Sequence, residues 1–231
     1  MKLKPSILIS VVGLLMAFNG CGKKPAVASW SNGNANGGVG GQFVNDVGVV
    51  PGKVGQAFAF DGGSNYLEVT SQPSLNLTKS LTIAFWAKRT APGLHIIVEK
   101  GGDWTTGKNS YSVCLNDNYL GGVFSFNFTG GWRGCHFNPD SEWHHYAVVA
   151  SQGQPDAILY VDGSPQTVTL RAGPTKLKMK PTSLPLHIGA QIDPNFNYFS
   201  KTLIDGLSIY NHTLSSRKIQ SLYTAGNTGK N

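Results

Sequence analysis

Charged residues are scarce in this sequence. Of its 231 residues 13% are charged, against about 25% in an average soluble domain, while 40% are hydrophobic and 10% are aromatic. Glycine is abundant, with 29 residues, and there are 12 prolines. Little charge, many turn-forming residues and many aromatic residues favour short strands joined by tight loops, and they are not typical of a disordered chain.

Acidic residues are too few and too scattered for glycosidase chemistry. The chain has three glutamates, Glu68, Glu99 and Glu142. A retaining glycosidase needs two carboxyl groups about 5–5.5 Å apart, which alternate positions of one strand can supply. Only Glu142 has a carboxylate two residues away, at Asp140, and this pair lies in an expected turn. A glycoside hydrolase is therefore a distant third among the functions considered.

Other catalytic arrangements are missing as well. The sequence contains no G-x-S-x-G motif, so it lacks the nucleophile elbow of α/β-hydrolases. His144 and His145 are adjacent, so on a strand they face opposite sides and cannot share a metal ion. We expect core or half-buried positions for both, and a protein that is not an enzyme.

The N-terminal apolar stretch is short. Ile7–Phe18 has 12 residues, whereas a membrane-spanning helix needs about 20. It follows Lys2 and Lys4 and leads to Gly20 and Cys21, which resembles a bacterial lipobox. Ordinary signal cleavage is the alternative. We predict a lipoprotein of the bacterial cell envelope, on the outer membrane or cell surface, with a signal peptide over residues 1–20, a lipid on Cys21, a tether over residues 21–27 and a folded domain over residues 28–231.

Cysteine is also rare, with three residues, Cys21, Cys114 and Cys135. If Cys21 carries the lipid, the other two remain as a pair in an oxidising compartment. We therefore predict a Cys114–Cys135 disulfide, worth roughly 3 kcal/mol for its loop length. Two buried free thiols are the alternative.

Short apolar runs alternate with turn signals along most of the chain. Asp162-Gly163 is typical of a hairpin turn, and Ser215–Ala225 has the pattern of a helix capped by Ser215 and ended by Gly226. With no helices between strands, these runs predict a β-sandwich or barrel. The expected strands are Gln56–Phe60, Tyr66–Val69, Leu81–Lys88, His95–Glu99, Tyr111–Leu115, Val123–Phe128, His144–Ala150, Ala157–Val161, Leu186–Ala190 and Leu203–Tyr210.

Eight short motifs make the expectation more specific. They are Gly55–Gly62, Asn65–Val69, Pro73–Leu77, Leu81–Trp86, Glu142–Ala147, Leu159–Gly163, Leu186–Gly189 and Leu203–Asn211. In this order they resemble the laminin-G-like, concanavalin A-like lectin/glucanase superfamily of bacterial surface proteins, over roughly residues 28–226. The sequence departs from the family at Gly206, where an acidic residue is usual, and at Lys218, where glutamate is usual. The resemblance implies an all-β jelly-roll sandwich of two antiparallel sheets with a short C-terminal helix.

Basic residues are spread along the chain, whose formal net charge is +7. The densest run comprises Arg171, Lys176, Lys178 and Lys180, and its lysines alternate with apolar residues. This alternation favours the solvent face of an edge strand over a nucleic-acid groove. We therefore expect no nucleic-acid partner.

Two aspartates suggest a structural cation. Asp205 shares strand parity with Leu203, Leu207 and Ile209, so its carboxylate should point toward apolar surroundings and needs a partner. Members of the resembled family often bind Ca²⁺ through such an aspartate. Here the resemblance implies a Ca²⁺ ion bound by both Asp205 and Asp61. The alternative is a carboxylate held by backbone N–H groups.

Three expected loops place large aromatic residues among polar ones, and flat rings beside amides and a carboxylate suit sugar rings or a protein contact. We predict a non-catalytic binding module, with a glycan as the first candidate ligand and a surface protein, or a structural role, as the alternative. The candidate ligand-binding residues are Trp104, Trp132, Arg133, Asp193, Asn195, Asn197 and Tyr198.

Overall fold

The computed structural model describes residues 25–31, 34–36, 40–102, 109–118, 122–138 and 140–228. The predicted signal peptide and the lipid site Cys21 lie outside these ranges. Within them, no helix combines the length and the apolar character needed to cross a bilayer.

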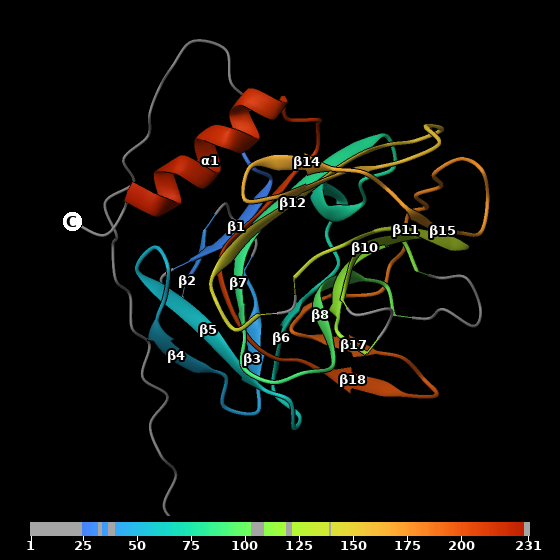
Figure 1. The fold of residues 1–231 in the computed structure, drawn as a ribbon. Helices are drawn as coiled ribbons and strands as arrows, with labels where there is room; N and C mark the ends of the chain where they lie inside the picture. Colours follow the sequence, from blue (N-terminus) through green and yellow to red (C-terminus); the bar gives the residue numbers. More distant parts are fainter. Residues whose placement is uncertain are drawn as a thin grey trace, which may run out of the picture.

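The strands form two antiparallel sheets stacked as a sandwich, which confirms the predicted jelly-roll fold (Figure 1). One sheet has the order β14-β13-β12-β7-β19-β1-β2, with β5 beside the first half of β19 and β4 beside β5. Its strands are β1 (Ala28–Ser31), β2 (Asn34–Asn36), β4 (Gly48–Pro51), β5 (Gln56–Asp61), β7 (Ser80–Arg89), β12 (His144–Ser151), β13 (Ile158–Val161), β14 (Ser164–Gln166) and β19 (Lys201–Tyr210). We refer to it as the nine-stranded sheet.

The second, eight-stranded sheet has the order β15-β11-β10-β9-β8-β16-β6-β3. Its strands are β3 (Gln42–Val44), β6 (Tyr66–Val69), β8 (Leu94–Lys100), β9 (Tyr111–Asn116), β10 (Val123–Phe128), β11 (Gly131–His136), β15 (Leu170–Ala172) and β16 (Leu186–Ile188). A separate hairpin joins β17 (Ala190–Ile192) to β18 (Asn197–Phe199), and the chain also has a short 3-10 helix, η1 (Pro73–Leu75), and a C-terminal helix, α1 (Ser216–Thr228).

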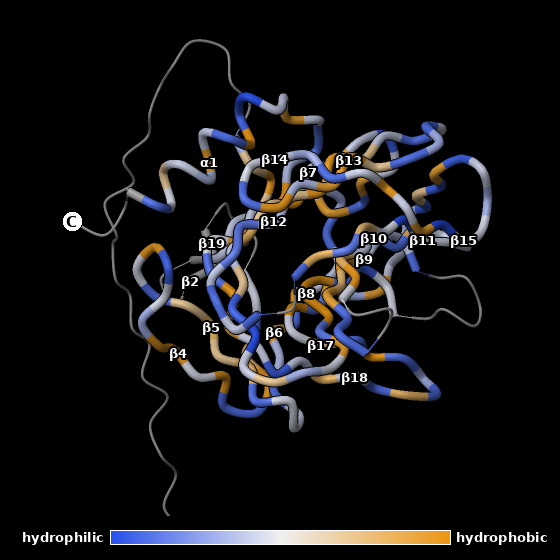
Figure 2. The backbone as a smooth tube through the Cα atoms, in the orientation of Figure 1, coloured by the Kyte–Doolittle hydropathy of each residue, from blue (hydrophilic) through white to orange (hydrophobic). Residues whose placement is uncertain are grey.

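The core lies between the two sheets and follows the period-two pattern of the sequence. Leu81, Ile83 and Phe85 of β7 are buried in it, as are Phe124 and Phe126 of β10. The rings of Phe85 and Phe124 meet edge to face with centroids 6.5 Å apart, which joins the sheets. Figure 2 shows the hydrophobic segments gathered on the central strands of both sheets. Full burial of each such side chain stabilises the fold by about 1.5–3 kcal/mol.

Helix α1 covers part of the outer face of the nine-stranded sheet. Ser215 caps it, as predicted, because its Oγ accepts a hydrogen bond from the backbone N–H of Lys218. Ile219 packs with apolar residues of β7, β12 and β13, and Tyr223 stacks on Trp86 at 5.7 Å. The sequence predicted that the helix ends before Gly226, but the helix continues through this residue. A Cβ at this position would lie 2.4 Å from Trp86 Nε1, so glycine serves close packing here rather than termination.

A bulge in β19 reverses the predicted direction of Asp205. Pairing with β7 shifts between Asp205 and Ser208, and Gly206 adopts a φ of 60° that favours glycine. Leu207 therefore faces the core, while Asp205 pairs with the outward-facing Trp86. The parity argument was wrong here because the bulge adds one residue to β19. Residues before and after the bulge with the same parity therefore face opposite sides of the sheet.

Most predicted strands are confirmed to within two residues, and so is the hairpin turn at Asp162 and Gly163, whose φ values are 50° and 77°. Two segments predicted as loops contain strands, namely β11 and the β17–β18 hairpin. The basic run does alternate, since Leu177 is buried and Lys176 exposed, but from residue 173 to 185 the chain is not a strand.

Candidate ligand-binding cleft

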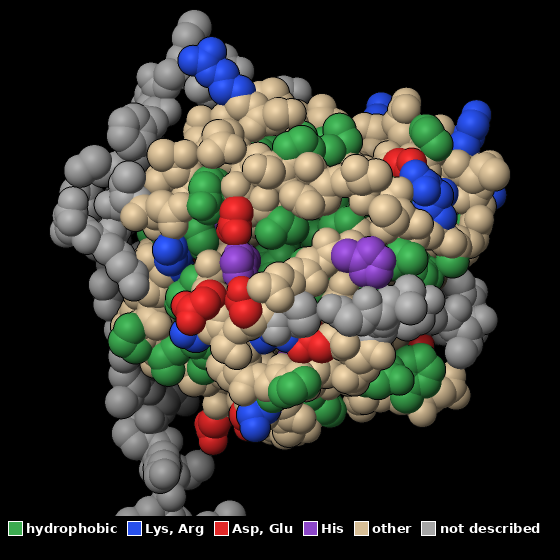
Figure 3. Space-filling model, viewed as in Figure 1, with side chains coloured by type: hydrophobic (Ala, Val, Ile, Leu, Met, Phe, Trp, Pro, Cys, Tyr) green, Lys and Arg blue, Asp and Glu red, His purple; other side chains and the backbone are tan. Residues whose placement is uncertain are grey.

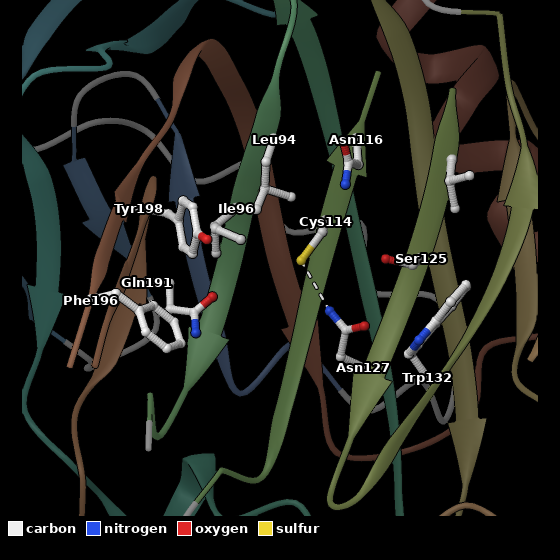
Figure 4. Close-up of a pocket in the computed structure, with 11 residues that line it drawn as sticks. Leu94, Ile96, Cys114, Asn116, Ser125, Asn127, Trp132, Gln191, Phe196 and Tyr198 are labelled. Atoms are coloured by element: carbon white, nitrogen blue, oxygen red, sulfur yellow. Dashed lines mark hydrogen bonds between the residues drawn. The ribbon is translucent and has the colours of Figure 1, made fainter. Parts of the chain in front are cut away.

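A cleft of about 510 Å³ lies on the outer face of the eight-stranded sheet. Strands β8 to β11 form its floor, and the β17–β18 hairpin, which lies along β8, forms one wall (Figure 4). The lining residues are Leu94, Ile96, Cys114, Asn116, Val123, Ser125, Asn127, Trp132, Gln191, Phe196 and Tyr198.

Strand alternation explains the polar groups on the floor. In β10, Phe124 and Phe126 face the core, so Ser125 and Asn127 between and after them face outward. In β9, Cys114 likewise lies between two core residues and opens into the cleft. On β9 and β10 the floor therefore carries amide, hydroxyl and thiol groups, beside the apolar side chains of Leu94, Ile96 and Val123.

Aromatic rings stand on both sides of this floor. Trp132 of β11 pairs with Asn127 of β10 and lies at one side of the cleft, while Phe196 and Tyr198 come from the hairpin at the other (Figure 4). The two hairpin rings contact each other edge to face at 5.6 Å and are 41% and 45% exposed. A ligand in the cleft would meet ring faces at the sides and hydrogen-bonding groups below.

Cys114 is the centre of a hydrogen-bond cluster on the floor. Its Sγ accepts a hydrogen bond from Asn127 Nδ2 at 3.0 Å and lies 3.3 Å from Ser112 Oγ. Burial, with a smaller contribution from the nearby Glu99 carboxylate, raises the pKa of the thiol to about 12. The thiol therefore stays protonated and is no nucleophile at neutral pH.

The predicted disulfide is wrong, because Cys114 and Cys135 are free buried thiols. Their strands flank β10, two strand spacings apart, or about 9–10 Å, beyond the roughly 7 Å limit for bridged Cα atoms. They also face opposite sides: Cys114 is in register with Ser125 on the cleft side, and Cys135 with Phe124 in the core.

The structure brings two of the predicted ligand-binding residues, Trp132 and Tyr198, to the cleft. Arg133 points to the other side of β11 and is 2% exposed. Its guanidinium lies over the Phe128 ring and donates to the carbonyls of residues 132, 155, 172 and 174. It holds surrounding backbone together and does not line the cleft.

Asp193, Asn195 and Asn197 lie at the turn of the β17–β18 hairpin. Asp193 Oδ1 accepts a hydrogen bond from the Asn195 backbone N–H at 2.9 Å, and Asn197 Oδ1 accepts one from the Asp193 N–H at 3.3 Å. These side chains shape the turn that carries Phe196 and Tyr198. Trp104 lies outside the described residues.

Sequence reasoning missed five polar or aromatic lining residues. Three of them lie on strands of the floor, whereas the search was made in loops, and the other two lie in the hairpin segment, where neighbouring residues were chosen instead. The usable signal was the alternation itself, since β9 and β10 place amides and hydroxyls where an ordinary solvent face has charges. The missed residues are Asn116, Ser125, Asn127, Gln191 and Phe196.

The predicted calcium pair does not fit a shared ion. Asp61 of β5 is in register with Lys201, the first residue of β19, and its Oδ1 accepts a hydrogen bond from the Gly63 N–H at 2.7 Å. Asp205 lies farther along β19, and its Oδ2 accepts one from the Val54 N–H at 2.7 Å. Among the described residues, no group of three or more His, Cys, Asp or Glu side chains is arranged to hold a metal ion.

Residues 61–220 match the family model of the concanavalin A-like lectin/glucanases superfamily, and the chain belongs to this family. No curated protein sequence matches the chain significantly.

Solved structures with the same fold are distant in sequence. The binding domain of botulinum neurotoxin serotype D/C has a TM-score of 0.66 at 13% identity, over 88% of this chain and 53% of that one. A structure of botulinum neurotoxin type C, whose cell entry depends on interaction with two ganglioside molecules, has a TM-score of 0.64 at 12% identity, over 87% of this chain and 51% of that one. The binding domain of botulinum neurotoxin DC in complex with rat synaptotagmin II has a TM-score of 0.62 at 13% identity, over 87% of this chain and 52% of that one. The chain thus spans about half the length of these structures.

Proposed function

We propose that this protein is a non-catalytic binding module that holds a carbohydrate in the cleft on its eight-stranded sheet. The observation that carries the proposal is the pairing of Trp132 and Tyr198 at the sides with the amides of Asn127 and Gln191. Sugar rings present flat C–H faces that stack on aromatic rings, and hydroxyl groups that bond amides. A largely apolar pocket with a few placed polar groups is the usual form of such a site.

Two comparisons support this proposal. The family includes lectins by its description, and one structure of similar fold concerns a toxin that interacts with gangliosides. The chemistry of the cleft supports binding without turnover, because its lining offers no carboxylate among the described residues and its thiol is protonated.

A glycan array on residues 28–231, followed by calorimetry with the strongest hit, tests the proposal. Trp132→Ala should weaken binding at least about tenfold, which corresponds to about 1.4 kcal/mol. Phe43→Ala is the matched control, since Phe43 is also an exposed aromatic residue of the same sheet but lies on the edge strand β3. An empty array, or equal losses in both variants, would contradict a sugar site in this cleft.

A protein ligand is the second candidate. It is favoured by the exposed ring pair of Phe196 and Tyr198, since exposed aromatic residues are frequent anchors of protein contacts, and by the synaptotagmin complex of one structure of similar fold. Phe196→Ser distinguishes the two candidates. A sugar, which would still contact Trp132 and the floor amides, should bind only somewhat more weakly, whereas a protein contact centred on the hairpin would be lost.

We further propose that Cys21 carries a lipid that holds the protein at the bacterial cell envelope. The lipobox-like end of the apolar stretch supports this. Mass spectrometry of the mature N-terminus should show a diacylglycerol-modified Cys21, and Cys21→Ser should release the protein from the membrane fraction. A soluble wild-type protein beginning at another residue would contradict the anchor.

A further inference from the structure

We infer that the cleft selects neutral, hydroxyl-rich glycans and excludes acidic ones, so that sialylated, sulfated or uronic sugars bind more weakly than their uncharged counterparts. This inference rests on the proposed carbohydrate-binding function. It runs against the net charge of the chain, which at +7 would attract anions from a distance.

The first reason is the direction of the hydrogen-bond donors on the floor. Asn127 Nδ2 donates to Cys114 Sγ at 3.0 Å (Figure 4) and to Ser112 Oγ at 3.2 Å, so the amide nitrogen points along the floor. The carbonyl oxygen of Asn127, an acceptor, is the atom that this arrangement turns toward a ligand. A sugar hydroxyl can donate to that oxygen, whereas a carboxylate or sulfate cannot.

The second reason is the scarcity of donors elsewhere in the cleft. Asn116 Oδ1 accepts a hydrogen bond from the Asn118 N–H, which leaves its Nδ2 as a neutral donor at one end. Gln191, in the hairpin wall, offers both a donor and an acceptor. Recognition of an anion in proteins relies on arginine, lysine or several convergent N–H groups. Amides that both donate and accept suit hydroxyl groups instead.

The third reason is where the nearby cations point. The described cleft lining contains no lysine, arginine or histidine. Arg133, on the same strand as Trp132, is directed away and bound to backbone carbonyls. Lys100, at the end of β8, is fully buried and donates to Ser71 Oγ and the carbonyls of Thr182 and Leu184. Neither cation faces the ligand.

The fourth reason is a carboxylate next to the floor. Glu99 of β8 is in register with Ser112 of β9, which in turn pairs with Asn127 of β10. It is fully buried, and its negative charge raises the pKa of the Cys114 thiol. A negative ligand above that thiol would therefore lie close to a buried carboxyl group. In Figure 3 the charged side chains of the visible face are scattered rather than gathered in one basic patch.

An array of matched glycan pairs tests the inference, with each neutral core printed alone and again with a sialic acid or sulfate cap next to the bound end. We expect binding to the neutral member to be at least tenfold stronger, and to change less than twofold between about 0.05 and 0.5 M NaCl. Stronger binding of the acidic members, falling as salt rises, would overturn the selectivity and leave the sugar-binding proposal standing. An array without any signal would overturn both.

Variants of Gln191 sharpen the test, because a substitution at this wall position can introduce either a positive or a negative charge. Gln191→Arg should shift the acidic-to-neutral affinity ratio toward acidic glycans at least tenfold and make it salt-dependent. Gln191→Glu, its matched control, should shift the ratio in the opposite direction. If both variants move the ratio equally and in the same direction, charge at the cleft does not determine selectivity and the inference is wrong.

Discussion

The two outer faces of the sandwich each carry a tryptophan, and the two side chains lie in different environments. Trp86 on the nine-stranded sheet is 4% exposed, because Tyr223 of α1 stacks on it and Lys53 Nζ lies 5.0 Å from its ring centroid. Trp132 on the eight-stranded sheet lines the cleft, and α1, the one α-helix among the described residues, lies on the other sheet. The position of α1, and not the residue type, makes Trp86 part of a packed face, whereas Trp132 lines the cleft.

The comparison shows how a sandwich of this kind can separate stability from binding. The face under α1 is packed with Ala84, Ala147 and Ile219. The uncovered face presents Ser125 and Asn127, whose side chains tolerate water. Substitutions on the two faces should therefore affect different measurements.

The largest effect is expected from Trp86→Ala. It removes a buried ring that contacts His145 and Tyr223, so the free energy of unfolding should fall by about 3–5 kcal/mol. Chemical denaturation followed by circular dichroism measures this. Glycan binding per folded molecule should be unchanged, and a loss of binding in fully folded variant would break the separation of the two faces.

The next effect concerns Asp205, below the loop that carries Val54. Asp205→Ala leaves the Val54 N–H without its acceptor and should cost about 1–3 kcal/mol. Burial raises the pKa of Asp205, so the charged form destabilises the fold at neutral pH. Asp205→Asn keeps an acceptor without charge and should be at least as stable as wild type. We also expect the melting temperature to be indifferent to chelator. A fall in chelator, restored by Ca²⁺, would instead revive the calcium hypothesis.

A smaller effect should distinguish His144 from His145, adjacent residues on opposite sides of β12. His144 Nδ1 lies 2.6 Å from Asp162 Oδ2 and its Nε2 lies 3.0 Å from Asp140 Oδ1, and these bonds raise its pKa. Its stabilisation is therefore complete below about pH 6.5 and is lost as the pH rises through the folded-state value. His144→Gln should cost about 1 kcal/mol or less, and only on the acid side.

His145 should behave in the reverse way, since burial lowers its pKa to about 4. The folded state then resists protonation, so this residue withdraws stability as the pH falls from about 6.5 toward 4. His145→Gln should remove that acid penalty. Unfolding free energies of both variants between pH 4 and 8 check the pair, and identical pH profiles would contradict the opposite environments.

The smallest effect on stability is expected from Trp132→Ala. The ring is half-buried at the side of the cleft, so unfolding should become easier by about 1 kcal/mol or less, while glycan affinity falls at least tenfold. A destabilisation as large as that of Trp86→Ala would show that Trp132 is a core residue, and the comparison of the two faces would then fail.

Much of the fold could be read from local pattern. Alternation in Leu81–Lys88 and Val123–Phe128 identified both the strands and their core faces, because side chains on a strand alternate by necessity. Trp132 and Tyr198 were found for a simpler reason, as aromatic residues among polar neighbours. The remaining cleft residues escaped because alternation in one strand does not reveal which outer face another element covers.

By itself, the sequence determined the strands, the Asp162-Gly163 hairpin and the Ser215 cap, all of which depend on interactions within a few residues. Tertiary structure alone decided the rest. It set Cys114 and Cys135 on opposite faces, turned Arg133 toward backbone carbonyls, and moved Asp205 outward through a bulge at Gly206. It also placed α1 over one sheet and the β17–β18 hairpin along β8 of the other. These outcomes depend on strand order and on contacts between residues distant in the chain, which no local pattern contains.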